Sequence, residues 1–210
     1  MNEMILHETF DAANPDPRLR WFCPPESWAI QNSCLVVQPN AKTDFWQKTH
    51  YGFEADNGHF LYLEVEGDFI LSTRLSFSPA HQYDQAGLMV RVSPDCWLKT
   101  SVEYEPYGFS KLGVVLTKDG YSDWSTQDYL DSSKELGLRV RREADDYLVE
   151  YLNPSPQEAG EAQRNWVQIR MAHLEGGKDG RVSCGLYACS PIEAGFTARF
   201  DFLKIERGRT

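Results

Sequence analysis

The chain has 210 residues with 21 Lys and Arg against 31 Asp and Glu, which gives a formal net charge of -10. A chain of this length can bury one sizeable core, and we expect residues 1–210 to form a single domain. The acidic balance argues against a nucleic-acid binder and against binding to anionic membranes, since both need a basic surface. No segment approaches the roughly 18 consecutive apolar residues of a membrane span.

The first residues and the cysteines predict a cytoplasmic protein. Residues 1–14 lack the basic stretch and long apolar run of a secretory signal. The five cysteines are scattered and contain no C-x-x-C pair, which favours reduced, mostly buried thiols over a zinc or redox site.

Apolar residues alternate with polar ones in most of the chain. Such alternation predicts strands, and turn sequences such as Asp56-Asn57-Gly58, Lys118-Asp119-Gly120 and Gly176–Gly180 separate them. No stretch keeps the apolar period of a helix. About a dozen strands would make an all-β sandwich or barrel. The clearest alternating segments are 68–77, 87–92, 97–104, 136–141, 166–171 (with Val167, Ile169 and Met171 on the apolar side) and 196–202. Residues Asn153–Gln163 are expected to form an exposed loop.

An aromatic-rich segment lies between residues 45 and 60. It contains Phe45-Trp46, His50-Tyr51 and His59-Phe60. It is expected either to fold over a groove or to cover an ordinary apolar core, where most aromatic residues lie.

One predicted strand carries a polar row on one face. Trp97, Lys99, Ser101 and Glu103 project together, while Leu98 projects the other way. Lys99 and Glu103 lie about 13 Å apart along a strand, too far for a direct hydrogen bond. The row is either a partly wet groove for a polar ligand or an exposed, solvated strand face.

A second cluster is Ser122-Asp123-Trp124. An aromatic ring next to short polar groups suits sugar recognition, in which the ring stacks on C–H bonds and hydroxyls are hydrogen-bonded. The alternative is a turn followed by a strand in which Trp124 only packs.

Carboxylate pairs offer a further possibility. Glu64, Glu66 and Asp68 alternate, as do Glu103 and Glu105, at a spacing that suits a glycosidase dyad. The alternative is that these carboxylates are only solvated, as charged residues on strands usually are.

Other catalytic and metal motifs are missing from the sequence. The histidines show no H-E-x-x-H or H-x-H spacing, and there is no G-x-S-x-G, P-loop or G-x-G-x-x-G motif. We expect no cofactor and no resident metal, although loop aspartates leave a calcium site open.

Several segments in order resemble the regulation-of-enolase-type family. They are Phe45-Trp46, Gly58-His59-Phe60, Gly67-Asp68-Phe69, residues 83–91 (YDQAGLMVR), Trp97-Leu98-Lys99 with Glu103, Ser122-Asp123-Trp124, Arg139, Ser190-Pro191, Gly195-Phe196 and Ala198-Arg199-Phe200. The resemblance implies a concanavalin A-like lectin/glucanase fold, a jelly-roll sandwich of two antiparallel sheets with one concave face. It implies no settled activity. Carried onto this chain, it marks as groove residues Gln85, Arg91, Trp97, Lys99, Glu103, Ser122, Asp123 and Trp124.

Three functions remain as hypotheses. The first is binding of a carbohydrate, with Trp97 and Trp124 as stacking platforms and with Lys99 and Arg91 as donors to a carboxylate- or phosphate-bearing sugar. The second is a sugar-active hydrolase or lyase with Glu103 as general acid or base, in which the neighbouring Lys99 lowers the carboxyl pKa and favours the base role. The third is a module that binds another protein, such as a metabolic enzyme.

Overall fold

The computed structural model describes residues 3–130, 135–152, 165–176 and 180–208. The loop expected at 153–163 lies outside these ranges. Within them the chain forms strands and no helix, as the alternation predicts, and hence no helix that could cross a membrane. The strands are β1 (Met4–Glu8), β2 (Arg20–Phe22), β3 (Ser27–Ile30), β4 (Leu35–Gln38), β5 (Phe45–Gln47), β6 (Glu54–Asp56), β7 (His59–Glu66), β8 (Phe69–Ser78), β9 (Gln85–Ser93), β10 (Cys96–Glu103), β11 (Lys111–Lys118), β12 (Tyr121–Asp128), β13 (Glu135–Glu143), β14 (Asp146–Leu152), β15 (Trp166–His173), β16 (Arg181–Cys189) and β17 (Thr197–Arg207).

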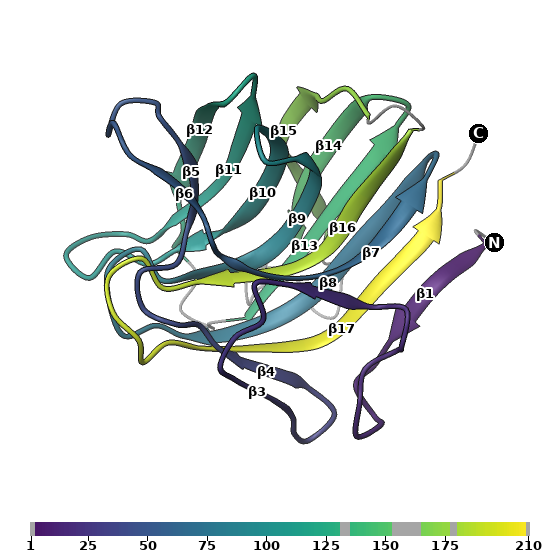
Figure 1. Cartoon of the computed structure of the whole chain (residues 1–210), viewed down its shortest axis with the longest axis horizontal. Coiled ribbons are helices and arrows are strands. Elements are labelled where there is room, and N and C mark those ends of the chain that lie inside the picture. The colour runs from purple at the N-terminus through teal and green to yellow at the C-terminus, as the bar shows by residue number, and fades with distance from the viewer. Residues whose placement is uncertain (1–2, 131–134, 153–164, 177–179, 209–210) are drawn as a thin grey trace.

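The described strands form two large antiparallel sheets and one small hairpin (Figure 1). One sheet has eight strands, in the order β15-β14-β13-β8-β17-β4-β3 with β1 paired to β17. The other has seven, in the order β12-β11-β10-β9-β16-β7-β2. The two-sheet sandwich expected from the sequence is therefore confirmed.

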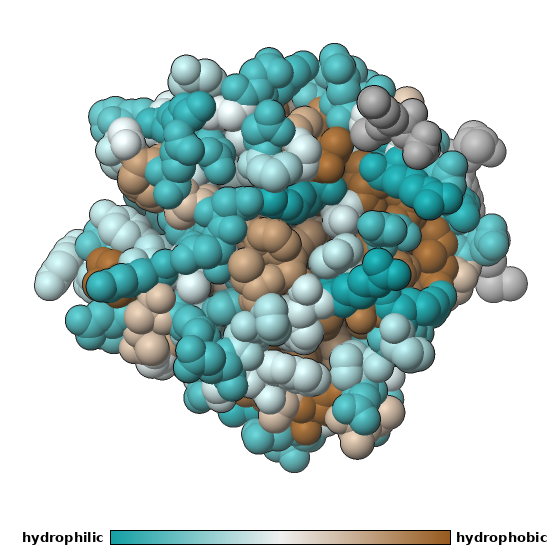
Figure 2. All heavy atoms as spheres, in the orientation of Figure 1, coloured by the Kyte–Doolittle hydropathy of each residue, from teal (hydrophilic) through white to brown (hydrophobic). Residues whose placement is uncertain are grey.

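The main core fills the space between the two sheets. Leu98 and Val102 of β10 project into it, as do Leu75 of β8 and Val140 of β13, and all four are almost fully buried. The polar row of β10 consequently faces outward. In the view of Figure 2, hydrophilic side chains cover most of the surface, and apolar ones show through in patches.

A second, smaller apolar cluster lies on the outer face of the seven-stranded sheet. The β5–β6 hairpin packs there, and Phe45 is fully buried against Trp97 and Tyr187, with ring centroids 6.0 and 6.3 Å away. Figure 1 shows the hairpin crossing in front of this sheet. The aromatic-rich segment thus does both things expected of it, since it covers a small core and folds over the sheet.

Strand β15 departs from the predicted pattern. A bulge between Val149 and Glu150 shifts its register against β14, so that the apolar side changes along the strand. Ile169 and Ala172 pack against the core, whereas Val167 is 36% exposed and Met171 is 63% exposed. The bulge lies between Val167 and Met171 and puts them on opposite faces, so the expectation that Met171 shares the apolar face of Val167 and Ile169 is wrong.

The close packing of β16 against β7 leaves no room for a side chain at Gly185. A Cβ at Gly185 of β16 would lie 2.0 Å from the carbonyl oxygen of Leu61 on β7. We expect Gly185→Ala to lower the free energy of unfolding by about 2 kcal/mol or more, because backbone atoms must move apart. Urea denaturation measures this. Gly108→Ala is the matched control, since nothing lies within 4 Å of its added Cβ, and equal effects in the two variants would contradict the packing.

Candidate functional site

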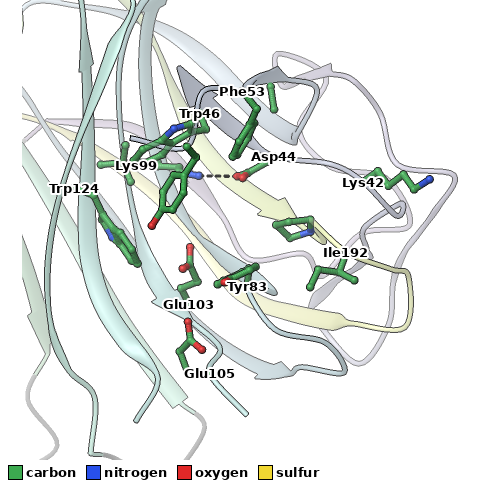
Figure 3. Close-up of a pocket in the computed structure, with 14 residues that line it drawn as sticks. Lys42, Asp44, Trp46, Phe53, Tyr83, Lys99, Glu103, Glu105, Trp124 and Ile192 are labelled. Atoms are coloured by element: carbon green, nitrogen blue, oxygen red, sulfur yellow. Dashed lines mark hydrogen bonds and ion pairs between the residues drawn. The ribbon is translucent and has the colours of Figure 1, made fainter. Parts of the chain in front are cut away.

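A cavity of about 510 Å³ lies between the β5–β6 hairpin and the outer face of the seven-stranded sheet. This volume is within the range of small-molecule sites, roughly 300–1,000 Å³. Its lining residues are Lys42, Asp44, Trp46, Tyr51, Phe53, Ala55, Tyr83, Lys99, Glu103, Glu105, Val115, Trp124, Pro191 and Ile192. Figure 3 shows how these side chains surround the space.

The floor of the cavity is a row across three neighbouring strands. Lys99 of β10 pairs in register with Val115 of β11, which pairs with Trp124 of β12. Because directly opposite residues share one face of a sheet, the three side chains project together. Gly113 leaves room for the indole of Trp124, since a Cβ there would lie 2.7 Å from the indole Nε1.

The walls come from the hairpin and from two loops. Trp46, Tyr51 and Phe53 form an aromatic chain on the hairpin side, with successive ring centroids 5.4 and 6.2 Å apart. The opposite wall is Tyr83, in the loop between β8 and β9, together with Ile192. Asp84 holds the Tyr83 loop in place, because its carboxylate accepts hydrogen bonds from the backbone N–H groups of residues 80 and 81, both 2.8 Å long.

Two ion pairs hold the hairpin against the sheet, one at each of its strands. Lys99 Nζ donates to Asp44 Oδ1 at 3.0 Å, directly before β5. Arg91 of β9 makes two bonds of 2.6 and 2.7 Å to the carboxylate of Asp56, the last residue of β6. Ser122 adds a third link, since its hydroxyl accepts a 2.9 Å bond from the backbone N–H of Gln47.

Glu103 lies at the end of β10, on the same face as Lys99. Its Oε2 accepts a 3.0 Å hydrogen bond from Gln85 Nε2, while Gln85 Oε1 accepts one of 3.1 Å from the hydroxyl of Tyr187. The two bonds fix the orientation of the Gln85 amide. Figure 3 shows the Glu103 carboxyl pointing into the cavity between Trp124 and Tyr83.

Burial decides the charge of Glu103. The pKa of Glu103 is raised to about 8, chiefly by desolvation; Lys99 lowers the pKa, whereas Asp44 and Glu105 raise it. Lys99 lowers this pKa, as expected from the sequence. The base role expected to follow is not favoured, because Lys99 is already paired with Asp44 and desolvation, the larger effect, makes the net shift upward. At neutral pH Glu103 is mostly protonated and suits an acid or hydrogen-bond donor.

Of the eight residues expected in the groove, Lys99, Glu103 and Trp124 line the cavity. Gln85 lies behind Glu103 and supports it. Arg91 and Ser122 hold the hairpin instead of facing the cavity.

The expected roles of Trp97 and Asp123 need correction. Trp97 is fully buried beneath Phe45, and its Nε1 donates to the carbonyl of Pro94 at 3.1 Å, so no ring face is left to stack on a ligand. Asp123 lies on the opposite face of β12 from Trp124 and pairs with Arg170 of the other sheet at 2.9 Å.

Several cavity residues were not predicted as site residues. Asp44, Tyr83 and Ile192 come from loops whose position depends on contacts far along the chain. The hairpin residues had a signal in the sequence, namely the density of aromatic residues around Trp46 and Tyr51, and Tyr83 begins the segment 83–91 that carries the family resemblance. The pair Glu103 and Glu105 was noticed as a carboxylate pair, and both line the cavity. The other candidates do not line it: Glu64 and Glu66 are exposed on β7, and Asp68 accepts a 2.8 Å hydrogen bond from the backbone N–H of Ala144.

No group of three or more His, Cys, Asp and Glu side chains among the described residues is arranged to hold a metal ion.

Fold and cavity together define the class: a concanavalin A-like β-sandwich with a hairpin-covered cavity on one sheet. The chain belongs to the family described as "Protein of unknown function (DUF1349)", which matches residues 21–208. It is 33% identical over 181 residues to "Regulation of enolase protein 1" of Saccharomyces cerevisiae, an alignment that covers 86% of this chain and 85% of the yeast protein.

Solved structures agree with this assignment. A functionally unknown Saccharomyces cerevisiae protein superimposes with a TM-score of 0.80 at 30% identity, covering 92% of this chain and 98% of that one. The xyloglucan-locus GH43B protein of Bacteroides ovatus gives a TM-score of 0.73 at 18% identity, covering 99% of this chain and 40% of that one. The second similarity shows the fold alone.

The raised pKa of Glu103 predicts a pH-dependent stability. Between the pKa of an unfolded glutamate and about 8, the folded protein binds the extra proton, so the free energy of unfolding falls as pH rises. The slope approaches about 1.4 kcal/mol per pH unit within that window. Glu103→Gln should remove this slope and gain stability relative to the parent toward pH 8. Urea unfolding at a series of pH values measures the difference. A stability difference that stays constant from acid to alkaline pH would contradict it.

Proposed function

We propose that the cavity binds a small saccharide. The observation that carries the proposal is the floor of the cavity, where the indole of Trp124 lies beside the polar groups of Lys99 and Glu103. A ring face for C–H groups next to hydrogen-bonding side chains matches the two-sided chemistry of a sugar ring. The aromatic wall of Trp46, Tyr51 and Phe53 adds apolar surface opposite that floor.

The charges of the cavity disfavour an anionic sugar. Both cations once expected to bind a carboxylate or phosphate already have partners, since Lys99 pairs with Asp44 and Arg91 pairs with Asp56. A ligand anion would also meet Glu105. We therefore replace the anionic ligand expected from the sequence with a saccharide that carries no negative charge.

Trp124→Leu tests the proposal. Loss of the indole face should weaken saccharide binding about tenfold or more, because stacking and apolar burial are both removed. Isothermal titration against a panel of mono- and disaccharides that carry no negative charge, amino sugars included, measures the affinity, beginning with those that raise the melting temperature.

Trp166→Leu is the matched control, since Trp166 packs on Arg139 on the outer face of the other sheet and should not affect binding. Equal affinity in the Trp124→Leu protein and its parent would remove Trp124 from the site. Absence of binding across the panel would overturn the saccharide proposal.

One observation favours a second candidate, a sugar-active enzyme. A protonated carboxyl within reach of a second carboxylate is the arrangement of glycoside hydrolysis, and here Glu103 has the raised pKa while Glu105 and Asp44 line the same cavity. Glu103 would be the general acid that protonates the leaving oxygen.

For this candidate, Glu103→Gln should abolish release of an aryl alcohol from aryl glycosides, because an amide has no proton to give, while saccharide binding persists. Chromogenic aryl glycosides with poor leaving groups provide the assay. Turnover that survives in Glu103→Gln would exclude this role, and no turnover in the parent would leave the cavity as a binding site.

The name of the yeast relative supports a third candidate, contact with a metabolic enzyme. Tyr107 and Phe109, in the loop between β10 and β11, are 96% and 58% exposed and offer an apolar surface outside the cavity. This candidate ranks third, because the relative's name describes that protein alone. For all three functions we propose a cytoplasmic location, which the five free cysteines support.

A further inference from the structure

We propose that the saccharide carries a protonated amine, bound between Glu103 and Glu105. This inference rests on the proposed function, because it specifies the chemical class of the ligand in the same cavity. It follows from the distribution of charge and aromatic rings along the cavity.

The cavity has charged groups at different places, and they are not equally available. Lys99 and Asp44 satisfy each other, at 4% and 17% side-chain exposure. Lys42 lies at the rim, and Figure 3 shows its side chain pointing away from the other lining residues. The carboxyls of Glu103 and Glu105 lie at the other end, so that this end of the cavity has an excess of acidic groups.

The carboxyl oxygens of this end are only partly used. Glu103 Oε2 accepts from Gln85, and Glu105 Oε2 accepts from Gln82 Nε2 at 2.8 Å. Within the described part of the chain, neither Oε1 atom has a hydrogen-bond donor. An ammonium group has three donors and no acceptor, so it matches a cavity end that offers free carboxyl oxygens.

The aromatic neighbours favour the same ligand group. Trp124 and Tyr83 lie on either side of Glu103 in Figure 3. Ring faces attract cations, by about 0.5–2 kcal/mol according to how far the cation is desolvated. A cavity end with two carboxyls and two flanking rings therefore suits a cation better than a neutral hydroxyl.

Binding of the amine would release one proton from Glu103. Before binding, Glu103 is mostly protonated at neutral pH because desolvation outweighs the opposing effect of Lys99, which is paired with Asp44. An ammonium group beside it supplies that counter-charge, so Glu103 releases its proton to solvent while the amine keeps its own. The complex then holds a carboxylate–ammonium pair.

Isothermal titration with D-glucosamine, D-glucose and N-acetyl-D-glucosamine tests the inference. At pH 7 we expect glucosamine to bind at least tenfold more tightly than the other two, which are matched uncharged sugars. The heat of glucosamine binding should also depend on the ionisation enthalpy of the buffer, since a proton is released. Equal affinities for glucosamine and glucose would overturn the inference and leave the saccharide proposal intact, whereas no binding of any sugar would overturn both.

Two variants and one further probe complete the experiment. Glu103→Gln should lose the preference for glucosamine and the dependence on buffer, yet still bind glucose. Glu64→Gln is the control, since Glu64 is exposed on β7 of the same sheet and does not line the cavity. Ethanolamine, an amine without a sugar ring, should bind far more weakly. If it binds as tightly as glucosamine, the ring contributes nothing and the amino-sugar assignment is wrong.

Discussion

Two ion pairs between the β5–β6 hairpin and the seven-stranded sheet determine the shape of the cavity. Lys99 binds Asp44 and Arg91 binds Asp56, and Phe45 is inserted between the two pairs. Arg91 also lies over the ring of Phe45, 5.9 Å from its centroid. The side chains of Lys99 and Arg91 are 4% and 10% exposed, and leaving a buried charge without its partner typically costs about 3–5 kcal/mol, so both pairs hold the hairpin in place. The space beneath its outer part is consequently preformed, and ligand binding need not order it.

The alternation of residues was enough to predict the two-sheet sandwich and, on β10, which side chains share a face. Lys99 and Glu103 lie on one face of β10 with Leu98 on the other, as the period of two requires. Which polar residues remain free for a ligand was not predictable. Asp56 and Asp44 precede their partners Arg91 and Lys99 by 35 and 55 residues, and no local pattern specifies such pairs. Arg91 and Lys99 therefore looked like free donors, although both are used within the fold.

For Trp97, too, the local sequence does not show what covers the side chain in the fold. Its place in a polar row suggested an exposed ring, since the segment that covers it is distant in sequence. In the folded chain Phe45 covers that ring and Lys99 Nζ lies 5.9 Å from its centroid, which gives Trp97 a cation–π contact with a buried lysine. A tryptophan beside charged residues in a strand can therefore indicate either a face that another segment covers or a ligand site. Trp124 differs because it lies in the next row, beyond the part of the sheet that Phe45 covers.

Some residues hold the hairpin on the sheet and others line the cavity. This division explains why similarity of fold does not identify the ligand. The sheet residues Arg91, Trp97 and Ser122 position the hairpin, whereas Trp46, Tyr51 and Phe53 of the hairpin itself form one wall. A change in those three side chains would alter the wall without disturbing the pairs that hold the hairpin. Proteins with this sandwich can therefore differ in ligand while sharing the sheet geometry, and the ligand must be argued from the cavity residues of each chain. In this chain those residues place paired charges at one end of the cavity and unpaired carboxyl oxygens at the other.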